Sequence, residues 1–362
     1  MASFSIGSRM VGDGYPCFII AEIGVNHNGD MKIAKKMIDA AADAGVDAAK
    51  FQLINADCLY VKDAGVVKTD SGDTIDAYKV WKNVEMPQVW LSELKKHCEK
   101  RDVLFFSSVF HIAGVDILNP YVDVYKIASA ETSDIPLLKK VARAGKPVII
   151  SLGGATLKET VEAVDAVKAE GNDRIALLYC VQKYPMPFAS ANISALKTLR
   201  KRFPDVVVGY SDHSLMPDPA VVPAAAVVYG AKIIEKHFTL SRSMEGIDHK
   251  MSVEPKELSR MVQTIRAAEK HGYEIPKEII GNSRIELTPE QEKNLRFVRR
   301  VIFATRDIKP GDIFSASNIA TLRPGYRDIT EALHPREYET ILGKRATCDI
   351  PERALIKKGY AK

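Results

Sequence analysis

The chain has 362 residues, of which 46% are hydrophobic, and a formal net charge of +5. This length allows one large domain with a small second one, and the modest charge, spread without a dense basic run, argues against nucleic acid as a partner. Five scattered cysteines without a Cys-x-x-Cys pair, and no apolar stretch of signal-peptide or membrane-spanning length, predict a cytoplasmic protein without membrane association.

Short apolar runs alternate with amphipathic stretches over most of the chain. We predict strands at residues 18–22, 48–52, 103–107, 124–127, 148–151, 175–180, 206–210 and 233–237. Helical periodicity follows each of them, at residues 31–44, 87–100, 113–118, 135–144, 157–170, 193–203, 218–229 and 255–271. Eight such units in roughly 250 residues predict an α/β fold, a (β/α)8 TIM barrel. A doubly wound open sheet is the alternative, because spacing alone does not establish closure.

The first predicted strand ends in a polar run that suits a substrate site. Glu22, Asn26 and His27 lie between this strand and the helix at residues 31–44, for which Asp30 is the expected N-cap. Reactive side chains also follow most of the other strands. A barrel gathers these carboxyl ends around one mouth, so we expect the polar residues there to meet in one site.

The alternation of strands and helices stops after the eighth predicted helix. We expect a catalytic barrel domain over residues 1–281, a charged and partly helical linker over 282–300, and a small β-rich domain over 301–362. In that last segment, residues 304–308 (ATRDI) recur as residues 346–350 (ATCDI), which indicates an internal pseudo-repeat or a chance match of turn sequences. Roughly 60 residues form a marginal core, so this domain should lean on the barrel or on a partner subunit.

Two histidines indicate a metal site. His213 and His237 follow the seventh and eighth strands, so a barrel would bring both imidazoles within reach of one divalent ion. Oxygen from water, substrate or Glu22 would complete the site, and Mn2+ is the natural candidate, with Mg2+ or Co2+ also possible. Asp212 or Glu235 would orient an imidazole as hydrogen-bond acceptor. The alternative is two unrelated histidines at a polar mouth.

Two lysines indicate an anion site. Lys50 and Lys126 end the second and fourth strands, and with Ser129, Ser151 and Ser211 they would form a ring of donors for a phosphate and a carboxylate. One lysine could instead lie solvated at the rim, or form a Schiff base in a lysine-dependent aldolase. The histidine pair argues against the aldolase, because a metal already supplies electrophilic activation.

Glu22 and Tyr184 each leave several roles open. Glu22 could bind a sugar hydroxyl, ligate the metal, transfer protons or cap its own loop. Tyr184 opens a proline-rich loop and could contact a substrate or pack within the loop. A non-enzymatic alternative is a sugar-binding or scaffold protein whose barrel is catalytically inactive. The retained lysines, histidines and Glu22 argue against it.

Several motifs together resemble the sialic acid synthase family, the nonulosonic acid synthases. They are residues 21–29 (AEIGVNHNG), 46–52 (VDAAKFQ), 125–131 (YKIASAE), 209–213 (GYSDH), 234–240 (IEKHFTL), 323–325 (RPG) and 342–344 (LGK). Each motif is weak alone, but their order over nearly the whole chain is specific. The resemblance implies a (β/α)8 barrel followed by a small antifreeze-like domain of the SAF type.

The resemblance also implies site residues by matched position. His213 and His237 would ligate the metal, usually manganese, and Lys50, Lys126, Ser129, Ser151 and Ser211 would hold phosphoenolpyruvate, with Ser108 also counted as substrate-binding. The acceptor sugar would contact Glu22, Gln52, Tyr184 and Asp248. Arg323 is similar to an arginine that the family lends to the neighbouring subunit's active site, which implies a domain-swapped homodimer.

The implied reaction is an aldol-like condensation. Phosphoenolpyruvate would attack an open-chain N-acetylated amino sugar, and carbon-oxygen cleavage would release phosphate. N-acetylmannosamine is the default acceptor, and diacetamido-trideoxy sugars leading to legionaminic or pseudaminic acid are the alternative. The sequence departs from the family where residues 151–154 read SLGG instead of STGM, 107–110 read SSVF instead of STPF, 323–327 read RPGYR instead of RPGNG, and Gln182 replaces asparagine. These departures lie at the mouth and leave the acceptor open.

Overall fold

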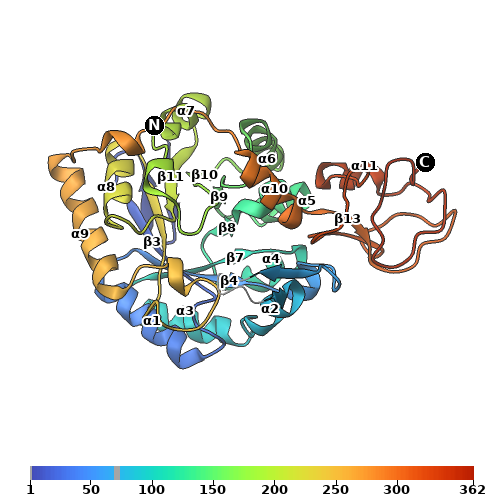
Figure 1. Ribbon diagram of the computed structural model, residues 1–362, viewed down its shortest axis with the longest axis horizontal. Helices are drawn as coiled ribbons and strands as arrows, with labels where there is room; N and C mark the ends of the chain where they lie inside the picture. The colour runs from blue at the N-terminus through green and yellow to red at the C-terminus, as the bar shows by residue number, and fades with distance from the viewer. Residues whose placement is uncertain (1, 69–73) are drawn as a thin grey trace.

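The computed structural model describes residues 2–68 and 74–362 of the chain, and a closed eight-stranded parallel barrel dominates it (Figure 1). Its strands are β3 (Phe18–Gly24), β4 (Ala48–Leu53), β7 (Leu104–Val109), β8 (Tyr125–Ile127), β9 (Val148–Ser151), β10 (Ile175–Tyr179), β11 (Val207–Asp212) and β12 (Ile233–His237). Pairing of β12 with β3 closes the sheet. Closure confirms the TIM barrel and excludes the open doubly wound sheet.

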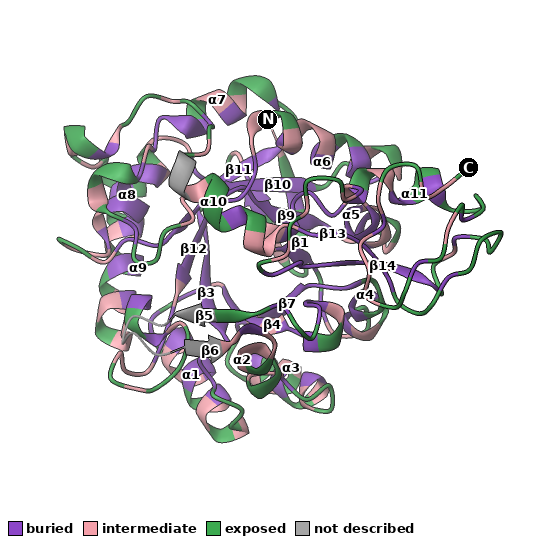
Figure 2. Cartoon of the chain, turned by 45° about the vertical axis from the view of Figure 1, so that its right-hand side comes forward, coloured by how far each residue is buried: buried purple, intermediate pink, exposed green. Residues whose placement is uncertain are grey.

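Helices cover the outside of this barrel, as the sequence periodicity predicts. They are α1 (Met31–Asp43), α3 (Trp90–Lys100), α4 (Ile112–Leu118), α5 (Ile135–Arg143), α6 (Leu157–Ala169), α7 (Ala195–Arg202), α8 (Val221–Val228) and α9 (Pro255–His271). Asp30 caps α1 as expected, because its side chain accepts from the backbone amides of Lys32 and Ile33. The strands are buried and the exposed residues lie mainly on the outer helices and loops (Figure 2).

A hairpin at the amino terminus, which the sequence analysis did not predict, covers one end of the barrel. Strands β1 (Ser3–Ile6) and β2 (Arg9–Gly12) pair antiparallel and bury Ile6 and Val11 in the barrel core. Arg9 forms an ion pair with Asp47, which directly precedes β4. The hairpin therefore lies at the amino-terminal ends of the strands and leaves the opposite mouth open.

A second unpredicted segment lies between β4 and α3. It contains the 3-10 turn η1 (Ala56–Cys58), the short strands β5 (Val66–Lys68) and β6 (Thr74–Asp76), and helix α2 (Ala77–Asn83). Because it follows the carboxyl end of β4, this insertion stands on the same side as the barrel mouth.

The chain beyond the barrel folds as a small domain beside it (Figure 1). Helix α10 (Pro289–Val298) lies within the charged stretch and leads into β13 (Val301–Ala304), which pairs antiparallel with β14 (Ile319–Leu322). The two copies of the pseudo-repeat pair with each other, since Ile308 and Ile350 exchange both backbone hydrogen bonds at 2.9 Å. Helix α11 (Tyr338–Ile341) adds to its core.

None of the helices in the described parts of the chain is both long and apolar enough to span a membrane.

Candidate active site

One pocket of about 430 Å³ lies at the carboxyl ends of the barrel strands. All thirteen residues predicted for the site line it: Glu22, Lys50, Gln52, Ser108, Lys126, Ser129, Ser151, Tyr184, Ser211, His213, His237, Asp248 and Arg323. The structure thus brings these thirteen side chains together, and their individual roles stay predictions. Asn26 and His27, which the sequence also places after the first predicted strand, do not line the pocket. Asn26 donates to Phe238 and Ser252, and His27 packs against Phe51 and Trp90.

Strand register explains why these side chains meet. Glu22 lies opposite Lys50 on the neighbouring strand, and Ser108 lies opposite Lys126. His237 lies opposite Glu22 across the β12–β3 pairing that closes the barrel. Because alternate residues of a strand point to the same face, these positions can all face into the carboxyl end of the barrel.

Lys50 and Lys126 are buried beside carboxylates. Nζ of Lys50 lies 2.6 Å from Oε2 of Glu22 and 3.6 Å from Oε2 of Glu235. Nζ of Lys126 donates to Ser151 Oγ at 2.7 Å and lies 3.8 Å from Oε1 of Glu235. The two ammonium groups therefore share Glu235, which places two cations at one wall of the pocket.

Burial and these charges act in opposite directions on the pKa values. Burial alone would lower the pKa of Lys50, but the Glu22 and Glu235 carboxylates raise it above its ordinary value. For Lys126 burial dominates and lowers the pKa, although Glu235 opposes this. Burial raises the pKa of Glu22, although the Lys50 charge opposes this rise.

The two histidines lie next to each other, with ring centroids 5.5 Å apart. Nδ1 of His213 lies 2.8 Å from the carbonyl oxygen of Val181, which only accepts, so Nδ1 carries the hydrogen and Nε2 keeps a lone pair. The expectation that Asp212 or Glu235 orients an imidazole is wrong for His213. The side chain of Asp212 binds Lys236 and Ser214 instead, because Lys236 lies buried beside it.

These imidazoles suit a divalent metal ion. Burial lowers the pKa of both His213 and His237, which keeps them neutral and available as ligands. Across residues 2–68 and 74–362, no group of three or more His, Cys, Asp or Glu side chains is placed to hold an ion. Glu22 is turned to Lys50 and Gln52, so water or substrate would supply the remaining ligands.

Arg323 brings the C-terminal domain into the pocket. From just beyond β14 it donates to Oε1 of Glu131 at 2.7 Å and to the hydroxyl of Tyr60 at 3.4 Å. In this chain Arg323 thus lines the pocket of its own barrel. The single chain does not test the expected exchange with a neighbouring subunit, which stays a prediction about the assembly.

Several lining residues were missed by sequence reasoning. Tyr60 and Trp81 come from the insertion after β4, Lys250 comes from the 3-10 turn η4 (His249–Met251), and Val298 ends α10. None of them lies at the end of a predicted strand. A search for polar residues at strand ends therefore does not find them. Tyr60 reaches the site through contacts far along the chain, with Phe297 and with Arg323, which lies 263 positions further on.

A closed barrel with lysines, carboxylates and imidazoles at its carboxyl mouth defines an enzyme of the TIM-barrel class. Residues 37–275 match the NeuB family, and residues 299–359 match the SAF domain. The chain belongs to the NeuB family, and its C-terminal domain is a SAF domain.

Curated relatives match over nearly the whole chain. The spore coat polysaccharide biosynthesis protein SpsE of Bacillus subtilis is 42% identical over 97% of this chain and 95% of its own length. The N,N'-diacetyllegionaminic acid synthase of Campylobacter jejuni is 38% identical over 94% of this chain and 98% of its own. The crystal structure of the Bacillus protein gives a TM-score of 0.86 at 40% identity, covering 98% of each chain.

Proposed function

We propose that the protein is a nonulosonic acid synthase that condenses phosphoenolpyruvate with an open-chain N-acetylated amino sugar. The observation that supports this most is the convergence of Lys50, Lys126, His213 and His237 on one pocket. Relatives named as legionaminic acid, pseudaminic acid and N-acetylneuraminate-9-phosphate synthases support the same class of reaction.

The lysine wall would bind phosphoenolpyruvate. Lys50 and Lys126 supply two ammonium groups, and Ser108 and Ser151, already hydrogen-bonded to them, supply neutral donors. The acceptor sugar would lie beside the lysines, against Glu22, Gln52, Tyr184 and Asp248. This arrangement would hold the enol carbon facing the sugar aldehyde.

The reaction forms one carbon-carbon bond and breaks one carbon-oxygen bond. C3 of phosphoenolpyruvate attacks the aldehyde carbon, and water adds to C2. The tetrahedral carbon then loses inorganic phosphate and leaves a 2-keto acid. Glu22 would move the proton between the water and the new hydroxyl. His213 and His237 would hold a divalent ion, most simply Mn2+, which polarises the aldehyde oxygen when bound.

N-acetylmannosamine is the default acceptor of this proposal, and a diacetamido-trideoxyhexose is the alternative. A domain-swapped homodimer and a cytoplasmic location also belong to the proposal, the latter because all five cysteines are free. Mixing Lys126→Ala chains with Arg323→Ala chains tests the dimer, because restored phosphate release requires that one chain's Arg323 complete another chain's barrel.

A phosphate-release assay tests the proposed reaction directly. Phosphoenolpyruvate, Mn2+ and a panel of hexosamine-derived acceptors are incubated with the protein, and inorganic phosphate and 2-keto acid are measured. We expect both products in equal amounts and only with an amino-sugar acceptor. Absence of phosphate release with every acceptor and every divalent ion would refute the proposal.

A further inference from the structure

A buried ion pair lies directly behind the two candidate metal ligands. Asp212 and Lys236 are opposite each other where β11 pairs with β12, and they directly precede His213 and His237. Their side chains are 0% and 1% exposed, and neither of them lines the candidate active site. Because successive residues of a strand point to opposite faces, the pair occupies the back of the two strand ends that present the imidazoles.

The Lys236 ammonium group binds both chain neighbours of His213. It donates to Oδ2 of Asp212 and to the carbonyl oxygen of Ser214. Asp212 in turn accepts from the amide of Ser214 at 3.1 Å and from its hydroxyl at 2.9 Å. The residues before and after His213 are thus fastened to the residue before His237. The ion pair therefore fixes the spacing of two strand ends at the point where each carries an imidazole.

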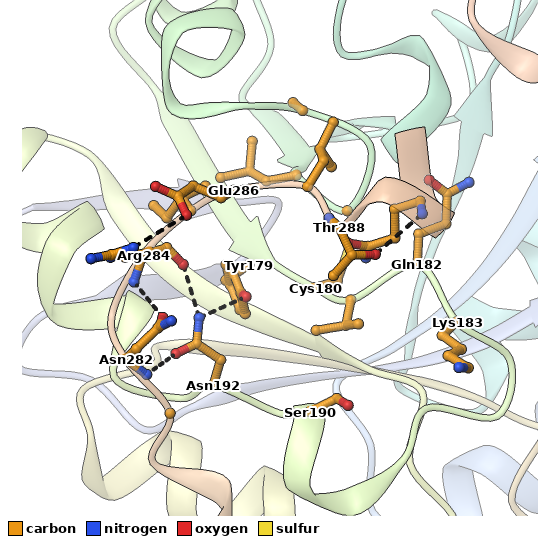
Figure 3. A pocket seen from close by; sticks show the side chains of 18 of the residues that line it. Tyr179, Cys180, Gln182, Lys183, Ser190, Asn192, Asn282, Arg284, Glu286 and Thr288 are labelled. Carbon is orange, nitrogen blue, oxygen red and sulfur yellow. Dashed lines mark hydrogen bonds and ion pairs between the residues drawn. The ribbon is translucent and has the colours of Figure 1, made fainter. Parts of the chain in front are cut away.

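The backbone held in this way also carries the loop that follows β10. The carbonyl oxygen of His213 accepts from the amide of Met186, and its Nδ1 binds the carbonyl oxygen of Val181, both at 2.8 Å. Gln182 of this loop lines both the active-site pocket and a second cavity of about 750 Å³, which is shown in Figure 3. A loop with a cavity on either side lacks packing there, so its position depends on the hydrogen bonds to His213.

Stability alone does not account for this ion pair. Burying two charges costs free energy that their attraction often fails to recover, and apolar residues can replace many such pairs without loss. Glu257 on α9 is near enough to feel the Lys236 charge, but it is paired with Arg242 at 2.5 Å. Asp212 is thus the carboxylate that neutralises Lys236. An ammonium group with three donors can bind a carboxylate and a carbonyl together, which an apolar side chain cannot do.

We propose, on the basis of the proposed function, that Asp212 and Lys236 are positioning residues for the metal site. They hold the imidazoles of His213 and His237, whose ring centroids are 5.5 Å apart, at the separation that one divalent ion needs. Neither side chain would touch the ion, because neither lines the pocket. The pair organises the histidines before the ion binds, so its loss weakens metal binding although both ligands remain.

The test measures Mn2+ affinity by titration calorimetry on the metal-free protein. The double variant Lys236→Met/Asp212→Asn removes both charges together, so no buried charge is left unpaired and the net charge beside the site is unchanged. We expect this variant to bind Mn2+ at least tenfold more weakly than wild type. The visible absorption of bound Co2+ depends on ligand geometry, so its shape should change as well.

Two further proteins separate positioning from a general loss of stability. The matched control Arg266→Met/Asp47→Asn removes an ion pair of 3.2 Å at the opposite end of the barrel, and its Mn2+ affinity should equal that of wild type. Ser214→Ala removes only the hydroxyl donor to Asp212. It should fold normally and weaken Mn2+ binding in the same direction, by less than the double variant. Urea unfolding and circular dichroism of each protein record stability and folding.

The possible results separate this inference from the proposed function. No Mn2+ binding by wild type would remove the metal from the proposed function and overturn the inference with it. Binding by wild type together with unchanged affinity in the folded double variant would overturn the inference alone, as would an equal loss in the matched control. Should the double variant not fold, Ser214→Ala decides: weaker Mn2+ binding supports the positioning role, and unchanged binding overturns it.

Discussion

Arg323 and Arg300 both donate to the same carboxylate oxygen, Oε1 of Glu131, at 2.7 and 3.4 Å. Glu131 belongs to the barrel, and both arginines belong to the segment that enters the SAF domain. Arg300 also donates to the carbonyl oxygens of Cys58, Phe110 and Thr321. This buried arginine therefore holds the domain in the orientation that puts Arg323 into the pocket.

Arg300→Met should strongly destabilise the protein, because it removes the buried donor to three carbonyls and one of the two arginines that neutralise Glu131. We expect a loss of about 3 to 5 kcal/mol in the free energy of unfolding, measured by urea denaturation. Arg336→Met is the matched control, since Arg336 also links the SAF domain to the barrel but pairs with Glu162 at the surface. This control should lose less than about 1 kcal/mol. Equal losses would contradict the role of Arg300.

Asp134 should make stability depend on pH. Burial raises its pKa to about 6 from an ordinary value of 3.8, although the Arg300 charge opposes the rise. The folded state then binds more protons than the unfolded state between these values, so the stabilising contribution at low pH is lost as pH rises through 6. Relative to wild type, Asp134→Asn should gain about 2 kcal/mol between pH 4 and pH 7. Urea unfolding of both proteins across this range measures it, and a constant difference would contradict the shift.

His213→Ala should remove metal binding without unfolding the protein. The imidazole is hydrogen-bonded to the carbonyl oxygen of Val181 and offers its other nitrogen to the pocket. We expect Mn2+ affinity, measured by calorimetry, and metal-dependent phosphate release each to fall at least tenfold. Circular dichroism should match wild type. His97→Ala on α3, where the imidazole pairs with Asp39 on the outer surface, should retain both properties.

Lys126→Met should weaken phosphoenolpyruvate use. Loss of a charged hydrogen-bond donor costs about 1.5 to 3 kcal/mol, which predicts a fall of roughly 10- to 150-fold in kcat/KM for phosphoenolpyruvate. Lys140→Met on α5, where the lysine pairs with Asp116, should behave as wild type. Borohydride treatment with pyruvate should leave Lys126 unmodified. A trapped adduct would instead favour the lysine-dependent aldolase.

Much of the fold and of the site could be predicted because both depend on local periodicity. Alternating apolar runs and amphipathic helices indicate a barrel, and α9 begins and ends at the predicted residues. Lys50, Lys126 and His237 were found because each lies within or at the end of a predicted strand, and closure of the barrel brings the carboxyl ends of the strands together. The hairpin formed by β1 and β2 was missed because its short strands alternate too briefly to stand out.

The sequence by itself determined the eight strand–helix units, their order and the polar residues that follow the strands, whereas the structure decided that the sheet closes into a barrel. Only the tertiary structure decided that Val181 orients His213, that Tyr60 and Arg300 join the environment of Arg323, and that a second cavity opens at Gln182. The physical reason is the range of the interactions. The periodicity of a strand or a helix can be read from a dozen consecutive residues. Contacts between loops depend instead on the path that each loop takes once the barrel has closed.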